Sequence, residues 1–295
     1  MPVKLYYSLV IILCLFAGVL IATGGFTIQI GGMSLSAHRI NSPVILIIIL
    51  TTVQFFISGD FRRSIIRCLE KLVDNKRYFL ALILSLSLVE FLLGLLYFIF
   101  YGQKVVFDLD SELSVSNYFS SFLLVFTGLI IGVIYQFERK SLRSHKGWWF
   151  IGFIFWYLSL DEVGRLHEGV LPFLERHASS LGLGQSAVKT WVLALSPFIL
   201  FTVVYFSIFF FKKLRHYLWI LTGLIIGLLL WILSIRLELW KDSSGPFYQY
   251  EVLVEELSEM IGSTLFLASF LGYFRIIKSR KRGQATPPLH VSAGK

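Results

Sequence analysis

The sequence predicts an all-α, polytopic integral membrane protein: a bundle of about eight transmembrane helices with both termini in the cytoplasm. Three observations support this fold class: the composition, the length of the apolar runs and the distribution of charge between them. Of the 295 residues, 56% are hydrophobic and only 15% are charged, whereas a soluble domain has about 25% charged residues. So few polar groups cannot cover a water-soluble globule, which excludes a cytosolic enzyme, a secreted disulfide scaffold and a disordered chain.

The apolar runs have the length of membrane helices. A helix needs about 20 mostly apolar residues to cross the ~30 Å hydrocarbon core of a bilayer. The runs are continuous and do not alternate with polar residues, so helices are favoured over strands. The first run could be a signal peptide, but it is long and its LIATGG sequence is a poor cleavage site, which favours a retained anchor. The eight predicted spans are residues 5–22, 42–58, 78–101, 117–136, 148–168, 190–211, 217–237 and 251–274.

Basic residues alternate from one connecting segment to the next and predict the orientation. The segments at residues 1–4, 59–77, 137–147, 212–216 and 275–295 hold 20 of the 27 basic residues and 4 of the 18 acidic ones. Because Lys and Arg are enriched in cytoplasmic loops, these segments and both termini are expected in the cytoplasm, beneath a plasma (inner) membrane. The net charge of +9 then reflects orientation and attraction to anionic lipids, and no nucleic-acid partner is expected.

The chain is predicted to form one domain followed by a tail. Residues 1–277 make up a single eight-helix transmembrane domain, and residues 278–295 a basic, disordered cytoplasmic tail. The hexapeptide TGLIIG occurs at residues 127–132 and 222–227, and each copy contains GxxxG, which predicts close helix packing. The repeat is also compatible with an inverted-repeat transporter, although the flanking sequences share only hydrophobicity.

Acidic residues gather at the outer ends of three predicted spans. A rise of ~1.5 Å per residue places the charged residues of spans 148–168, 217–237 and 251–274 at a similar depth. Glu251, Glu255 and Glu259 of the last span would form one row along a helix. Because stacked like charges destabilise a helix, a cation must face this row. The residues at this depth are Asp161, Glu162, Arg165, His167, Glu168, Arg236, Glu238, Glu251, Glu255, Glu256 and Glu259.

These acidic residues outnumber the cations beside them, namely Arg165, Arg236, Lys241 and, when protonated, His167. Either burial keeps several carboxyl groups protonated, or a bound divalent metal neutralises them. Carboxylates with a single imidazole suit Fe, Mn, Mg or Ca better than Zn. The expected metal ligands are Asp161, Glu162, His167, Glu255, Glu256 and Glu259.

Three classes of function remain open. In a metal-dependent enzyme, the metal would activate water or oxygen against a lipid-borne or small-molecule substrate at the outer membrane face. His167 and Glu168 would be the catalytic residues, and Arg236 would bind an anionic headgroup. In a cation- or proton-coupled transporter, Glu90 would be a further relay residue. In a non-catalytic assembly subunit, the carboxylates would pair with Arg165, Arg236 or a partner. Membrane lipids are the expected partners, and the oligomeric state stays open.

Overall fold

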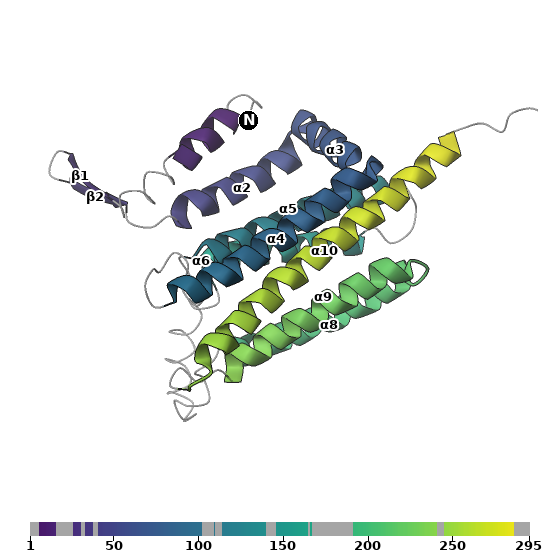
Figure 1. Cartoon of the computed structure of the whole chain (residues 1–295). Coiled ribbons are helices and arrows are strands. Elements are labelled where there is room, and N and C mark those ends of the chain that lie inside the picture. The colour runs from purple at the N-terminus through teal and green to yellow at the C-terminus, as the bar shows by residue number, and fades with distance from the viewer. Residues whose placement is uncertain are drawn as a thin grey trace, which may run out of the picture.

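The computed structural model of the chain is helical in its described parts, apart from one short hairpin (Figure 1). It describes residues 6–15, 26–30, 33–37, 41–101, 109, 114–139, 146–164, 166, 191–240 and 245–285. The helices are a short apolar helix Tyr6–Leu15, α2 (Asn41–Ile57), α3 (Gly59–Asp74), α4 (Lys76–Phe100), α5 (Val115–Glu138), α6 (Lys146–Gly164), α8 (Trp191–Leu214), α9 (Leu218–Trp240) and α10 (Tyr248–Ala285). The helical fold class predicted from composition and apolar runs is thus confirmed in outline.

The hairpin is a feature that the sequence analysis did not predict. Strand β1 (Phe26–Ile30) pairs antiparallel with β2 (Met33–Ala37), and Ile30 stands opposite Met33. The sequences FTIQI and MSLSA alternate apolar and polar residues, a period of two that is typical of strands. In Figure 1 the hairpin lies to one side of the helices, so it does not change the helical class.

Five of the described helices are long and apolar enough to cross a membrane: α4, α5, α8, α9 and α10. Helices α2 and α3 would add a sixth span if they are counted as one, although they are bent by 101° relative to each other. The predicted spans 5–22 and 148–168 correspond to the helix Tyr6–Leu15 and to α6. Neither helix is among the five that qualify as membrane spans. The count of eight therefore stays a prediction.

Helix α3 is amphipathic and lies where the sequence analysis places a connecting segment. Its first turn is capped by Ser58, whose hydroxyl accepts a hydrogen bond of 3.2 Å from the backbone N–H of Phe61. Phe61 and Val73 are buried, while Arg63 and Arg67 are exposed. A helix with one apolar and one basic face, set nearly at right angles to α2, fits a position along a membrane surface.

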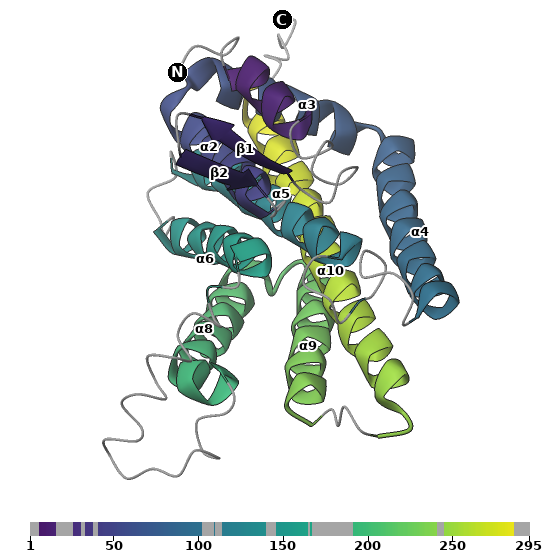
Figure 2. The ribbon, with the colours of Figure 1, turned by 90° about the vertical axis from the view of Figure 1, so that its left-hand side faces the viewer.

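Helix α10 is the central helix of the bundle. It packs against α9, α5, α4 and α3, and Figures 1 and 2 show it running through the middle of the molecule. In the most apolar stretch of each span, 72% of α5 and of α10 is buried inside the molecule, against 17% of α4 and 11% of α8. The core therefore forms around α5 and α10, and much of α4 and α8 is exposed on the outside of the bundle.

Glycines allow the central helices to approach each other closely. A Cβ atom on Gly227 of α9 would lie 3.0 Å from the carbonyl oxygen of Gly262 in α10. A Cβ on Gly128 of α5 would lie 2.6 Å from Nε1 of Trp156 in α6. Gly128 and Gly227 belong to the two TGLIIG copies, so the close packing predicted from GxxxG is confirmed.

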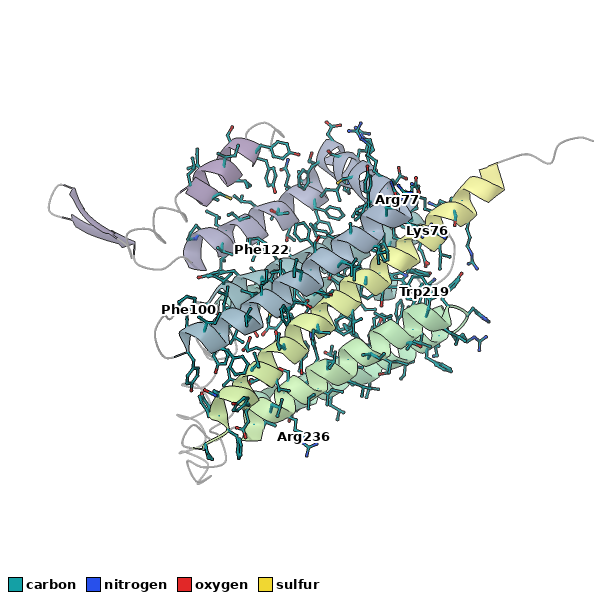
Figure 3. The ribbon with its side chains drawn as sticks, in the orientation of Figure 1. Lys76, Arg77, Phe100, Phe122, Trp219 and Arg236 are labelled. Atoms are coloured by element: carbon teal, nitrogen blue, oxygen red, sulfur yellow. The ribbon has the colours of Figure 1, made fainter. Side chains whose placement is uncertain are left out.

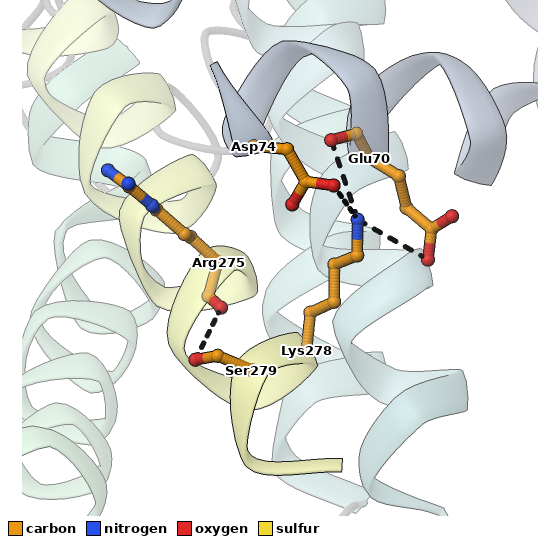
Figure 4. Close-up of polar contacts among 5 residues, drawn as sticks. All are labelled: Glu70, Asp74, Arg275, Lys278 and Ser279. Atoms are coloured by element: carbon orange, nitrogen blue, oxygen red, sulfur yellow. Dashed lines mark hydrogen bonds and ion pairs between the residues drawn. The ribbon is translucent and has the colours of Figure 1, made fainter. Parts of the chain in front are cut away.

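A lysine near the end of α10 holds α3 in place. The side chain of Lys278 is 5% exposed, and its Nζ lies 2.8 Å from Oδ2 of Asp74 and 3.8 Å from Oε1 of Glu70 (Figure 4). The same Nζ donates to the backbone carbonyl of Glu70 at 3.5 Å. Residues 278–285, predicted as the start of a disordered tail, instead belong to α10, which contacts α3 and continues to Ala285.

Among the described residues, the basic ends of α3, α4 and α10 and the turn between α8 and α9 lie at one end of the bundle. In Figure 3, Lys76, Arg77 and Trp219 lie at this end, and Phe100 and Arg236 lie at the opposite end. The contacts of Lys278 place the end of α10 there as well. The predicted orientation requires the basic segments to lie at the same end of the bundle. Which side of a membrane that end faces stays a prediction.

Candidate functional site

Acidic side chains from α6 and α10 meet at the end of the bundle opposite the basic one. Asp161 and Glu162 lie in the last turn of α6, while Glu256 and Glu259 lie in the first turns of α10. The side chains of Glu162 and Glu259 are hydrogen-bonded to each other, and Glu162 also interacts electrostatically with Asp161 and Glu256. These four residues are called the acid cluster below.

A hydrogen bond between two carboxyl groups, such as that of Glu162 with Glu259, needs a proton on one of them. An ionised carboxylate can only accept hydrogen bonds, so one of the two carboxyl groups must be protonated in order to donate. Two ionised carboxylates in contact would instead repel each other. Since Asp161 and Glu256 add further negative charge around Glu162, the proton offsets part of this repulsion. Bound protons are one of the two solutions to the charge imbalance that the sequence left open.

Hydrogen bonds between α5 and α6 position the acidic end of α6. The hydroxyl of Ser121 donates to the backbone carbonyl of Ser159 at 2.8 Å, and the hydroxyl of Ser159 donates to the carbonyl of Ser121 at 2.8 Å. Both serines are fully buried. Ser159 precedes Glu162 by less than one helical turn, so this reciprocal pair fixes the place at which Glu162 leaves α6.

A tryptophan of α9 positions the acidic part of α10. Nε1 of Trp231 donates to the backbone carbonyl of Glu259 and to the hydroxyl of Ser263, each at 3.2 Å. The ring of Trp231 also lies against Gly262, where a Cβ would come within 2.7 Å of its Cδ1 atom. The backbone at Glu259 is therefore held against α9 while its side chain reaches Glu162 of α6.

The other predicted site residues are placed as follows. Glu255 is 5% exposed and lies on α10 one turn before Glu259. Arg236 is exposed, and Figure 3 shows its side chain pointing away from the bundle. His167 and Glu168, the predicted catalytic residues, lie outside the described residues. Their roles, and the anchoring role of Arg236, stay predictions.

Within the part of the chain that the structure describes, no group of three or more His, Cys, Asp or Glu side chains is arranged to hold a metal ion. The acid cluster offers donor oxygens, but Glu162 and Glu259 are joined by a hydrogen bond. The predicted ligand His167 does not belong to the described residues. A metal site at this position therefore stays a prediction.

Comparison with known families identifies the domain that carries this site. Residues 75–274 match the model of the family described as Domain of unknown function (DUF8692). The chain belongs to the DUF8692 family. The matched region begins at the N-cap of α4, ends within α10 and contains the whole acid cluster. No curated protein and no solved structure matches the chain, so the function of this DUF8692 protein has to be argued from the site.

One important carboxylate of this DUF8692 protein was missed by the sequence analysis. Glu138, at the end of α5, pairs with Lys213 of α8, accepts a hydrogen bond from the hydroxyl of Tyr273 in α10, and accepts another from Nε1 of Trp148 in α6 at 3.2 Å. It therefore joins four helices at the basic end. The signal in the sequence was its isolation, because Glu138 is the single acidic residue of the basic segment 137–147.

Another buried carboxyl group, that of Glu90, lies between the two ends. Glu90 of α4 is 3% exposed, and its Oε1 accepts a hydrogen bond of 2.5 Å from the hydroxyl of Thr264 in α10. The sequence predicts a relay role for Glu90 if the protein is a transporter. The structure gives it a polar partner on the helix that also carries Glu256 and Glu259.

Proposed function

We propose that the acid cluster binds a divalent metal ion and that this DUF8692 protein is a metal-dependent membrane enzyme acting on a lipid-borne substrate. The observation that supports the proposal is the contact of Glu162 with Glu259. Carboxylates of two separate helices converge there, and a metal ion would replace the proton that they share. Such ligands must lose their protons to bind metal.

The donor atoms favour hard or borderline cations. Carboxylate oxygens suit Mg²⁺, Ca²⁺ and Mn²⁺, and one added imidazole also suits Fe²⁺. Asp161 and Glu256, which interact with Glu162, would supply further oxygens. His167 and Glu168 follow in the sequence and would complete the ligand set or provide the base.

The site is proposed to face outward. The acid cluster lies at the end opposite the basic segments, and the positive-inside tendency assigns basic loops to the cytoplasm. The cluster would then lie near the outer surface of a plasma membrane, where a lipid headgroup can reach it from the bilayer. A bound metal would polarise the substrate or a water molecule, and a neighbouring carboxylate would accept the proton.

Metal binding by carboxamide variants tests the proposal. In detergent-purified full-length protein, Glu259→Gln and Glu162→Gln are expected to weaken Mn²⁺ binding by at least about ten-fold, since each removes a charged ligand. Equilibrium dialysis followed by metal analysis gives the affinities. The matched control is Glu238→Gln, a carboxyl group of α9 outside the acid cluster, which should leave Mn²⁺ binding unchanged. No Mn²⁺ binding by the wild type, or equal losses in all three variants, would contradict the proposal.

The second candidate function is proton- or cation-coupled transport. It is favoured by the burial of Glu90 and its hydrogen bond to Thr264 on α10, because intramembrane carboxyl groups are common in ion relays. If transport is the function, proteoliposomes should show cation-dependent uptake that Glu90→Gln abolishes. If the protein is instead a metal-dependent enzyme, Glu90→Gln should leave the Mn²⁺ affinity of the acid cluster unchanged, and the proteoliposomes should show no uptake.

A further inference from the structure

A groove between α8 and α9 lies near the basic end of the bundle, away from the acid cluster. Its volume is about 560 Å³. Figure 2 shows α8 and α9 separating as they leave their connecting turn, and the groove occupies the part nearest the turn. Its lining includes Ile208, Phe211 and Lys212 from α8, and Leu221, Ile225 and Leu228 from α9.

The wall of this groove is apolar and open to one side. Phe210 and Leu224 form a buried floor, at 4% and 1% exposed, whereas Ile208, Phe211 and Ile225 are about half exposed. The one hydroxyl in the lining belongs to Ser207, and it donates to the backbone carbonyl of Val203 at 2.8 Å. The wall therefore presents hydrocarbon to any occupant.

Basic side chains lie at the end of the groove nearest the turn between α8 and α9. Lys212 lines the groove and is exposed, and Arg215, also exposed, follows in the turn between the helices. The neighbouring Lys213 is engaged by Glu138. Lys212 thus provides the ammonium group closest to an occupant of the groove.

We propose that this groove binds an anionic phospholipid, with an acyl chain between α8 and α9 and the phosphate at Lys212. The apolar wall and the cation at its end match the two parts of such a lipid, and basic pockets between membrane helices are known lipid sites. From Leu221 to Leu228 the groove follows α9 for roughly 10 Å, about a third of the hydrocarbon core. It therefore holds the part of the acyl chain nearest the headgroup.

Native mass spectrometry of the full-length protein in detergent tests this proposal. The protein is titrated with phosphatidylglycerol and, separately, with phosphatidylcholine of the same acyl chains. Wild-type protein should retain phosphatidylglycerol more tightly. Lys212→Gln should weaken phosphatidylglycerol binding about five-fold, because one cation near a phosphate is worth about that factor. It should weaken phosphatidylcholine binding less, because the choline cation of that lipid offsets the charge of its phosphate. Ile225→Trp should weaken both lipids, because the indole fills the groove.

Matched control variants distinguish lipid binding in the groove from nonspecific attraction of lipid to the basic end of the protein. Lys76 is an exposed cation at the same end on α4 (Figure 3), and Leu84 is an apolar residue of α4 that is 61% exposed. Lys76→Gln and Leu84→Trp should leave both affinities unchanged. Equal binding of the two lipids by the wild type, equal losses in Lys212→Gln and Lys76→Gln, or no effect of Ile225→Trp would overturn the proposal. A dimer that persists without lipid and is broken by Ile225→Trp would also overturn it, since a second copy would then occupy the groove.

Discussion

Replacing Gly262 with Leu is expected to lower the free energy of unfolding by about 3 kcal/mol, the upper part of the usual range for overpacking a tight core. A Cβ at this position would lie 2.7 Å from Cδ1 of Trp231 and 3.0 Å from the backbone carbonyl oxygen of Gly227. A side chain could move away from the new atoms, but the backbone of α9 cannot do so without shifting the helix. The shift would also strain the hydrogen bonds of Trp231 to Glu259 and Ser263.

Unfolding of the detergent-solubilised protein by a denaturing detergent, followed by circular dichroism, measures this loss. The control is Gly59→Leu in α3, where a Cβ would meet only Nη2 of Arg62 at 3.9 Å. The control should change the unfolding midpoint little. If both variants unfold at the wild-type midpoint, α9 and α10 do not cross as closely as described.

Replacing Glu138 with Ala is expected to cost about 3 kcal/mol of stability. Removing one partner of a buried ion pair leaves the other charge without compensation, and such losses are typically about 3–5 kcal/mol. The side chains of Glu138 and Lys213 are 11% and 24% exposed, so solvent screens the pair only in part, which favours the lower figure. The hydroxyl of Tyr273 and Nε1 of Trp148 would lose their acceptor as well.

A double-mutant comparison separates the ion pair from the other contacts of Glu138. Glu138→Ala combined with Lys213→Met should unfold closer to the wild type than Glu138→Ala alone, because the uncompensated cation is gone. Asp60→Ala is the surface control, since Asp60 and Arg63 form a pair in which both side chains are about three-quarters exposed, and such pairs contribute little. Equal stability of Glu138→Ala and Asp60→Ala would mean that Glu138 does not join the four helices.

Much of the helical layout could be predicted from the sequence, because a membrane span leaves a long apolar run. The predicted spans 78–101, 117–136 and 217–237 match α4, α5 and α9 to within three residues at each end. The close packing at Gly128 and Gly227 was also predictable, since a small residue every four positions produces a groove on a helix. Helix α3 was not predicted, because its amphipathic sequence carries too many charges to register as an apolar run.

The partners of the buried polar residues could be predicted only in part. Helical phase and depth predict Asp161, Glu162, Glu256 and Glu259 at one level; in the structure Glu162 is hydrogen-bonded to Glu259 and interacts electrostatically with Asp161 and Glu256. Arg236 has the same depth, yet it is exposed and points away from the bundle in Figure 3, because depth does not define how a helix is rotated. Glu138 acquires its partners from three other helices, which is a matter of tertiary packing that local sequence does not encode.

The position of bound Mn²⁺ in crystals of the full-length protein tests the central claim most directly. Anomalous scattering from crystals grown with excess Mn²⁺ should show a peak about 2.0–2.6 Å from carboxylate oxygens of Glu162 and Glu259, the range of metal–oxygen bonds for such cations. The two carboxyl groups should then bind the metal in place of their mutual hydrogen bond. A hydrogen bond that persists between Glu162 and Glu259, with no anomalous peak beside it, would contradict the account.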